Sequence, residues 1–154
     1  MTVTWVKPTE ALLTSIAENM RKADIEEVWA SGRYPPLDAV IDGWRASDYS
    51  TVAVNDYGEP LAVVGLCKRG MLTGLGVVWM LSTESSLQYR REFIRQAGPL
   101  LGELLDICPR LCNMVHSKNT SSIRWLRRLG FTIESPEPCG QDGELFHRFH
   151  IERV

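Results

Sequence analysis

Residues 119–131, N-T-S-S-I-R-W-L-R-R-L-G-F, constrain what this chain can fold into more than any other segment. They follow an apolar run that contains Met114 and Val115. The opening Asn and Thr are residue types whose short side chains satisfy unpaired backbone N–H groups at a helix start. Gly130 suits the helix end, because glycine adopts the left-handed conformation without a steric penalty. The segment therefore predicts a strand followed directly by a capped helix.

This predicted helix has two unlike faces. Its apolar residues recur at i, i+3 and i+6, the spacing of one helical face; they are Ile123, Leu126 and Leu129. The arginines cluster on another face; they are Arg124, Arg127 and Arg128. Three arginines on one face are either a solvated surface or a contact surface for phosphate groups, bound by charge-assisted hydrogen bonds.

The rest of the chain alternates between strand-like and helix-like patterns. Alternating β-branched and aromatic residues predict strands, and apolar residues three to four positions apart predict helices. The predicted strands are residues 2–7, 51–55, 61–67, 77–81, 111–116, 132–134 and 145–151. Helices are predicted within residues 8–32, as two short helices or one kinked helix, and within residues 37–47, 82–109 and 119–130.

Local signals refine the helix boundaries. Thr9 can cap the first helix, and Asp24 with Glu27 three residues later is a second cap signature. Gly98-Pro99 should kink or split the long helix, because proline lacks a backbone donor and its ring clashes with the preceding turn.

The order of elements is β-α-α-β-β-β-α-β-α-β-β. Hairpin strands followed by β-α-β crossovers predict an α/β fold with a mixed sheet of about seven strands and helices on both faces. The length of 154 residues lies within the usual span of about 100–200 residues for one domain. We therefore expect residues 1–154 to form one domain.

Composition excludes several classes of function. A formal net charge of −2 gives the whole molecule no electrostatic reason to bind nucleic acid or an anionic membrane. No apolar run approaches the roughly 18 residues of a membrane span, and the N-terminal segment lacks the features of a signal peptide. The four cysteines include no C-x-x-C pair. We expect a cytoplasmic protein with free core thiols and no metal site.

The element order and residues 119–131 together resemble the GNAT (Gcn5-related N-acetyltransferase) superfamily. In that family the helix after the central strand typically reads N-x-x-A-x-x-x-Y-x-x-x-G-F, and Asn119, Ser122, Leu126, Gly130 and Phe131 fall on those positions. More narrowly, W-A-S-G near residue 30, S-D-Y at residues 47–49 and the helix itself resemble small GNAT-like proteins of podovirus-type tailed phages. Some of those are internal virion proteins.

The resemblance implies an acetyl-CoA site in a gap between the strands at residues 77–81 and 111–116. The pantetheine arm would pair with strand backbone, and the pyrophosphate would lie on helix N-terminal N–H groups at residues 83–88. The cofactor-binding residues that it implies are Leu81, Thr83, Ser85, Ser86, Gln88, Arg90, Asn119, Ser122 and Arg124.

Two features depart from the family pattern. The pyrophosphate loop is usually R/Q-x-x-G-x-G/A, and in the register Q-Y-R-R-E-F the glycine positions hold Arg91 and Phe93. Leu126 occupies the position of the tyrosine that protonates the leaving thiolate, and leucine cannot donate a proton. Tyr89, Ser121 or water could take its place.

Several side chains have both a structural and a functional interpretation. Asn119 either caps its own helix or hydrogen-bonds a pantetheine amide. Glu84 either favours a helix dipole or acts as a general base, and His116 is either a structural residue at a strand end or a base. Trp29 and Trp44 either pack the core or line a substrate pocket.

Two functions of different classes follow. The first is an acetyl-CoA-dependent N-acetyltransferase acting on the primary amine of a small molecule or a protein. The second is a catalytically silent GNAT-like phage protein that binds a phage or host partner, in the host cytoplasm or the virion. The missing glycines and tyrosine favour the second, and Asn119 with Gly130 and Phe131 supports the fold without deciding.

Overall fold

A computed structural model describes residues 2–70 and 72–154. The helices are α1 (Glu10–Glu18), α2 (Lys22–Gly32), α3 (Pro36–Ala46), the 3-10 helix η1 (Glu84–Tyr89), α4 (Arg90–Ile107) and α5 (Thr120–Leu129). The strands are β1 (Thr4–Val6), β2 (Tyr49–Val54), β3 (Pro60–Gly70), β4 (Leu75–Ser82), β5 (Arg110–His116), β6 (Thr132–Ile133), β7 (Glu137–Cys139) and β8 (Glu144–Glu152).

These strands form one mixed sheet in the order β1-β2-β3-β4-β5-β8-β6, with β7 paired to β8. The neighbouring strands pair antiparallel except β4 and β5, which are parallel. The predicted α/β class and mixed sheet are therefore confirmed. The sheet has one strand more than expected, because β7 lies between residues 134 and 145, where the sequence predicts no strand.

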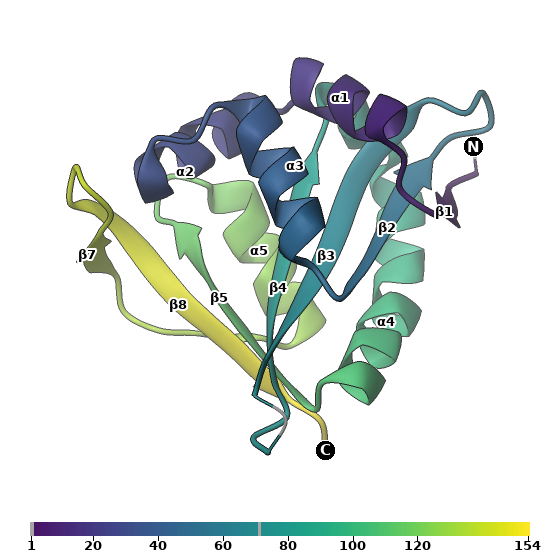
Figure 1. Cartoon of the computed structure of the whole chain (residues 1–154). Helices are drawn as coiled ribbons and strands as arrows, with labels where there is room; N and C mark the ends of the chain where they lie inside the picture. Colours follow the sequence, from purple (N-terminus) through teal and green to yellow (C-terminus); the bar gives the residue numbers. More distant parts are fainter. Residues whose placement is uncertain (1, 71) are drawn as a thin grey trace.

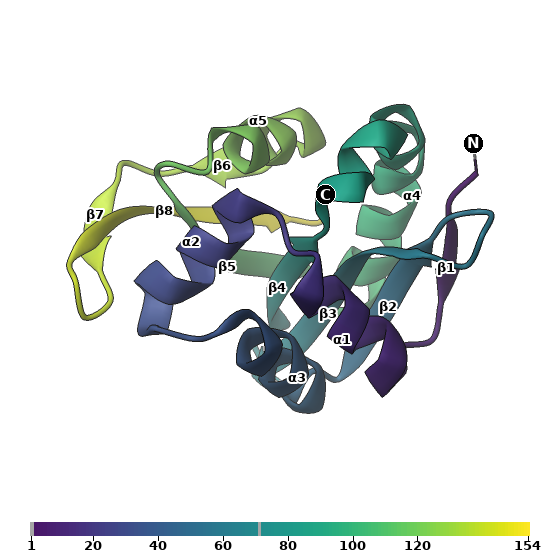
Figure 2. The same ribbon diagram turned by 90° about the horizontal axis from the view of Figure 1, so that it is seen from above.

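Helices cover the sheet on both faces. Figure 2 shows α1 and α3 on one side of the sheet and α4 and α5 on the other. The helix α2 lies near the end where β5 leads into α5 (Figure 1). Because α4 connects β4 to the parallel strand β5, it runs back along the sheet from the end of β4 to the start of β5.

The described residues form three apolar core clusters, one under α1 and α3 and two that each include a residue of α4. Under α1 and α3, Leu13, Ile16 and Val40 are fully buried against the sheet. Under α4 and α5, Leu104 and Phe131 belong to the corresponding cluster. The start of β3 is buried at every position from residue 60 to residue 67, as expected for a strand covered on both faces.

The two parallel strands separate soon after they meet. Residues Leu75, Gly76 and Val77 of β4 pair with Arg110, Leu111 and Cys112 of β5, and the ladder ends there. Beyond it the Nδ2 of Asn113 donates a hydrogen bond to the Val78 carbonyl oxygen at 2.8 Å, so a side chain replaces the next backbone contact. A gap between β4 and β5 follows, as the sequence resemblance predicted.

The first helical segment is divided into two helices. Thr9 caps α1 as predicted, since its Oγ1 accepts a hydrogen bond from the Leu12 N–H at 3.2 Å. Met20 then forms an isolated β-bridge with Thr83, which ends the helix. The second predicted cap is wrong, because the N-cap residue of α2 is Arg21 and no side chain caps it.

The long helix is not split at Gly98-Pro99, since α4 continues from Arg90 to Ile107 with Pro99 inside it. Phe93, Ala97 and Leu104 are buried on one side of α4 on both sides of the proline. Burial of this apolar face offsets the roughly 3 kcal/mol that an interior proline costs.

Candidate functional site

A cavity of about 520 Å³ occupies the gap between β4 and β5. Val78 and Met80 of β4 and Met114 of β5 form part of its wall. On one face of the sheet it reaches residues of α4 and α5, and on the other it reaches Ser31 of α2 and Gly43 of α3. The cavity therefore extends to both faces of the sheet.

Backbone groups of β4 point into this gap. The Val78 carbonyl oxygen accepts the hydrogen bond from Asn113, and the Ser82 N–H donates to Asp24 Oδ2 at 3.0 Å. Alternate residues of a strand direct their backbone groups to the same edge. Met80, midway between Val78 and Ser82, therefore presents its N–H and carbonyl oxygen to the gap, where an extended ligand with amide groups can pair with them.

Two carboxylates from α2 bind the separated strand ends. Asp24 Oδ2 accepts hydrogen bonds from the N–H and the hydroxyl of Ser82 on β4, at 3.0 and 3.2 Å. One turn further, Glu27 Oε1 accepts a hydrogen bond from the N–H of His116 on β5 at 2.8 Å. The helix α2 thus satisfies a backbone donor on each side of the gap and fixes the separation of the two strands.

Arg21 connects these carboxylates to the start of α5. Its guanidinium donates to Asp24 Oδ1 at 2.8 Å, to Ser121 Oγ at 2.7 Å and to Ser122 Oγ at 3.1 Å. Burial opposes its charge, but the hydrogen bond to Asp24 and the nearby carboxylates raise the pKa of Arg21 above its ordinary value. The arginine is therefore a permanent positive charge beside the cavity.

Asn119 is at the centre of this network and is 1% exposed. Its Oδ1 accepts a hydrogen bond from Arg21 at 3.1 Å, and its Nδ2 donates to Asp24 at 3.4 Å and to Glu27 at 3.3 Å. Asn119 is the N-cap residue of α5, as predicted, but its side chain makes no capping hydrogen bond to the helix. A contact between Asn119 and pantetheine stays a prediction, and it requires Asn119 to exchange one of these partners.

Glu27 has a strongly perturbed acidity. The pKa of Glu27 is raised from 4.5 to about 7: burial, the largest cause, and the charge of Asp24 raise it, while hydrogen bonds from the His116 N–H and from Asn119 and the charge of Arg21 lower it. The side chain lines the cavity. A carboxyl group with a pKa near the working pH is suited to exchange protons as a general base.

From the sequence alone these two carboxylates were not placed in the gap, because their spacing was interpreted as a helix cap. A signal was present in the spacing. Asp24, Glu27, Val28 and Ser31 follow i, i+3, i+4 and i+7, so all four share one helical face. If Val28 faces the interior, both carboxylates must face it too.

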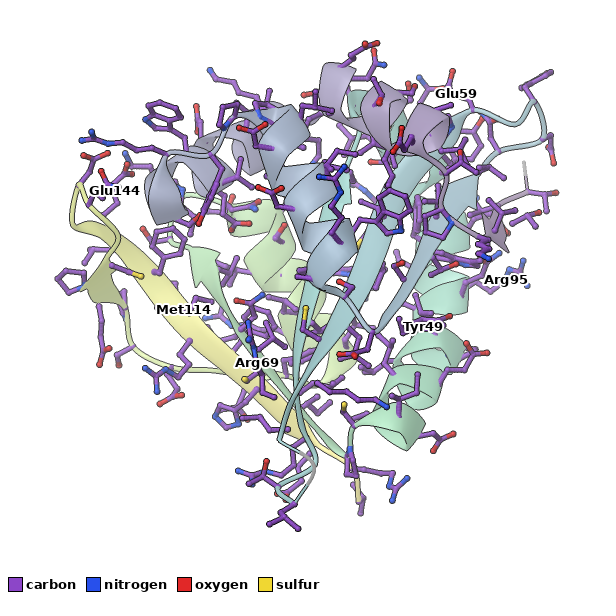
Figure 3. The ribbon with its side chains drawn as sticks, in the orientation of Figure 1. Tyr49, Glu59, Arg69, Arg95, Met114 and Glu144 are labelled. Atoms are coloured by element: carbon purple, nitrogen blue, oxygen red, sulfur yellow. The ribbon has the colours of Figure 1, made fainter. Side chains whose placement is uncertain are left out.

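The two predicted bases lie away from the cavity. The ring of His116 is buried, with Nε2 2.7 Å from Glu144 Oε1 and its centroid 5.1 Å from that of Phe146, and it is not part of the cavity wall. Figure 3 shows Glu144 at the start of β8. Glu84 Oε1 accepts a hydrogen bond from the Lys22 N–H at 3.0 Å. Glu84 therefore supports the first turn of α2, a structural role at a helix other than its own.

The loop from β4 to α4 contains both structural and free side chains. Leu81, just before this loop in β4, is buried in the core and also lines the cavity. Thr83 Oγ1 donates to the Leu61 carbonyl oxygen at 3.2 Å, and Ser86 Oγ donates to the Thr83 carbonyl oxygen at 2.6 Å. These hydroxyl groups hold the loop in place. Ser85, Gln88 and Arg90 form no hydrogen bond through their side chains within residues 2–70 and 72–154, and Arg90 lines the cavity.

The side chains at the two glycine positions do not block the start of α4. Phe93 is 7% exposed and packs edge-on against Trp5, with ring centroids 6.1 Å apart. Arg91 is exposed, and no ion pair to it exists among the described residues. These two side chains therefore lie beside the start of α4 without covering it, and Arg90 and Arg91 add positive charge there.

On α5, Ser122 and Leu126 line the cavity and Arg124 is exposed to solvent. The Tyr89 hydroxyl accepts a hydrogen bond from Asn55 Nδ2 at 3.1 Å, away from the cavity. Of the substitutes considered for the missing tyrosine, only Ser121 has its side chain in the cavity wall.

Neither tryptophan predicted to bind substrate lines the cavity. Trp44 packs against the core cluster under α1 and α3, and Trp29 is 51% exposed on α2. Trp79 and Trp125 contribute to the wall instead.

All four cysteines are free thiols; Cys67 and Cys108 are buried in the core as expected, whereas Cys139 lines the cavity.

The described part of the chain contains no cluster of His, Cys, Asp or Glu side chains arranged to hold a metal ion. None of its helices combines the length and the apolar character that crossing a membrane requires.

No protein-family model matches the sequence, and no curated protein matches it. Solved structures do share its fold. A chimera of spermidine N-acetyltransferase SpeG from Vibrio cholerae and hSSAT superposes with a TM-score of 0.73 at 13% identity, over 99% of this chain and 96% of that one. A GNAT-family acetyltransferase from Bacillus anthracis gives 0.71 at 10% identity, over 99% and 95%.

The spermidine N-acetyltransferase from Vibrio cholerae in complex with CoA and spermine gives a TM-score of 0.65 at 12% identity, over 99% of this chain and 96% of that one. These similarities extend over nearly the whole length of both chains. They confirm that the fold is that of the GNAT acetyltransferases.

Proposed function

We propose that this protein is an acetyl-CoA-dependent N-acetyltransferase that acts on a primary amine. One observation carries the proposal: the gap between β4 and β5 leads from the start of α4 to the carboxyl group of Glu27, whose pKa is about 7. Such a gap offers backbone pairing for an extended thioester cofactor, and such a carboxyl group suits the removal of a proton from an amine.

The residues around the gap fit the parts of acetyl-CoA. The first turn of α4 with Arg90, Ser85 and Gln88 would hold the pyrophosphate, and the exposed Arg124 would meet the 3′-phosphate. The backbone of Met80 would pair with the pantetheine amides. Ser122 and Asn119 lie at the same end of the gap, and Arg21 would release one of them when the site is filled.

Acetyl-CoA, when bound, supplies an acyl thioester that is open to attack by an amine. Glu27 in its ionised form accepts the proton that the amine loses as the new C–N bond forms. Leu126 cannot protonate the thiolate that leaves as the C–S bond breaks. The Ser121 hydroxyl or a water molecule would fill that role, since Ser121, unlike Tyr89, contributes to the cavity wall.

The acceptor amine would enter from the side of α2 and α3. On that face the cavity wall includes Ser31, Ala39 and Cys139. Approach from this face places the amine next to Glu27 and opposite the helices that would hold the cofactor. The Vibrio cholerae structure with CoA and spermine supports an amine as the class of acceptor.

A second proposal rests on the same network. Arg21, Asp24 and Asn119 satisfy one another's hydrogen bonds at the end of the gap, and Leu126 removes the acid. A closed hydrogen-bond network and the absence of the acid also suit a GNAT-fold protein that binds a partner and catalyses no reaction. The sequence resemblance to phage proteins then implies a host or virion partner and a location in the host cytoplasm or the virion.

Calorimetric titration with acetyl-CoA distinguishes the two proposals. We expect binding with a Kd below about 1 mM, the upper end of ordinary KM values. Arg90→Glu should weaken binding at least about tenfold, since it places a negative charge beside the pyrophosphate. The matched control is Arg45→Glu on α3, an exposed arginine on the opposite face, which should bind as the wild type does.

A thiol-release assay with a panel of primary amines, including spermine and lysine peptides, completes the test. Release of CoA that depends on the amine supports the enzyme. Absence of acetyl-CoA binding by the folded protein would exclude it. Binding without transfer to any amine would favour the protein that acts by binding alone.

A further inference from the structure

The cavity is lined by apolar side chains where it passes between α4 and α5. Its wall there is formed by aliphatic side chains of both helices and by one aromatic ring just after α5: Leu100, Leu101, Leu104, Leu126, Leu129 and Phe131. Polar groups nearby are satisfied inside the protein. Trp5 Nε1 donates to Gln96 Oε1 at 2.7 Å, and Asn113 Nδ2 donates to the Val78 carbonyl oxygen.

The side chains that face this space are not close-packed. Leu100 and Leu101 of α4 and Leu126 and Leu129 of α5 pack onto the core cluster under these helices but are only half-buried. Protein interiors normally leave few spaces larger than a water molecule. Figure 2 shows α4 and α5 side by side on the same face of the sheet. The space between them is therefore available to a ligand.

The polarity of the cavity changes along its length. At the end where β4 finishes, Arg90, Ser121 and Ser122 contribute to the wall. At the other end lie Leu104, near the end of α4, and Leu129, near the end of α5. That end corresponds to the level where β4 and β5 pair, since β5 begins just after α4. A ligand that fits must be polar and anionic at one end and apolar at the other.

We propose that the space between α4 and α5 binds an acyl chain longer than acetyl, so that the preferred cofactor is a medium-chain acyl-CoA. This inference rests on the proposed function, because it continues the cofactor site beyond the thioester. It also gives a reason for Leu126. A leucine at that position keeps the wall apolar where a tyrosine would place a hydroxyl group that needs a hydrogen-bond partner.

Titrations of the full-length protein with CoA, acetyl-CoA and octanoyl-CoA test this inference. Octanoyl-CoA should bind at least about tenfold more tightly than acetyl-CoA, because six further methylene groups leave water. Leu129→Trp should fill the space and remove this preference while leaving acetyl-CoA affinity within a few-fold. Leu101→Trp would fill the same space from α4, and it replaces Leu129→Trp in the test if that variant fails to fold.

The matched control is Ile94→Trp. Ile94 lies on α4, is 37% exposed and does not line the cavity, so this variant should keep the preference for octanoyl-CoA. Thermal denaturation monitored by circular dichroism establishes that each variant is folded before titration.

Equal affinities for acetyl-CoA and octanoyl-CoA would overturn the acyl site and leave the proposed function intact. A preference that survives both tryptophan substitutions would also overturn it, because the chain would then bind elsewhere. If neither thioester binds the folded wild type, both the acyl site and the proposed function are wrong.

Discussion

At the scale of single residues, Glu27 is the most informative position in this protein. Its carboxyl group is held by the backbone N–H of one strand and by Asn119, with Asp24 close by. The neighbouring Glu26 on the same helix is exposed to solvent. Two adjacent glutamates thus have different chemistry, because only one of them points into the gap between β4 and β5.

Glu27→Gln should abolish most of the acetyltransferase activity. The amide cannot accept a proton, and loss of a general base usually lowers the rate by about 10² to 10⁴-fold. The amide oxygen can still accept the hydrogen bond from His116, so acetyl-CoA binding should change by no more than a few-fold. Steady-state kinetics and calorimetry on the same samples provide the measurement.

Glu26→Gln is the matched control for this change and should retain wild-type rates. In the wild type, activity should rise with pH as Glu27 ionises around its pKa of about 7. A Glu27→Gln variant with an unaltered rate would assign the proton transfer to another group.

At the scale of elements, the position of α3 against the sheet depends on glycines that make room for Trp79. A methyl group added at Gly65 on β3 would overlap the indole ring of Trp79, and one added at Gly43 on α3 would crowd it. The indole Nε1 donates to Ser47 Oγ at 2.9 Å. Trp79 therefore packs between helix and strand because both neighbours lack a side chain.

Gly65→Ala should lower the free energy of unfolding by about 1–3 kcal/mol, the usual cost of overpacking. It should also shift the indole fluorescence as Trp79 moves. Gly102→Ala is the matched control, since a methyl group at Gly102 on α4 meets no atom within 4 Å. That variant should gain about 0.5–1 kcal/mol through higher helix propensity. Urea denaturation of both variants measures the difference, and equal stabilities would contradict this packing.

At the scale of the whole molecule, the buried carboxyl group of Glu27, where the two parallel strands separate, makes the stability of the fold depend on pH. The pKa of Glu27 is about 7 in the folded protein and ordinarily 4.5. Between pH 4.5 and about 7, the carboxyl group of Glu27 is protonated in the folded state and ionised in the unfolded state. Because the folded state binds the proton more tightly, the contribution of Glu27 to stability is complete below pH 4.5 and is lost as pH rises to about 7.

Glu27→Gln should remove this part of the pH dependence. At pH 8 we expect the variant to be more stable than the wild type by on the order of 1–3 kcal/mol, with the advantage disappearing near pH 4.5. Urea denaturation at pH 4.5, 6 and 8 gives the difference between the two proteins, which cancels contributions from other groups. A difference that does not vary with pH would contradict the perturbed acidity.

Local patterns in the sequence were sufficient to predict most of the elements. The Thr9 cap and the Gly130 helix end, with its φ of 100°, lie where predicted, because caps depend on a few consecutive residues. The segment 119–131 also indicated the fold. The strand β7 was missed, since Glu137 and Pro138 form a strand only through pairing with β8.

The sequence by itself determined the class of fold and the order of most of its elements, because these follow from periodicity and short-range signals, and its resemblance to GNAT proteins predicted the gap between β4 and β5. Only the tertiary structure decided which polar groups meet inside that gap. Asp24 and Glu27 have the spacing of a helix cap, and asparagine is a common capping residue. In the structure, however, the side chains of Asp24, Glu27 and Asn119 form hydrogen bonds with residues far away in the chain. Local spacing cannot reveal such contacts, since burial and charge at one position depend on residues brought there from elsewhere by the fold.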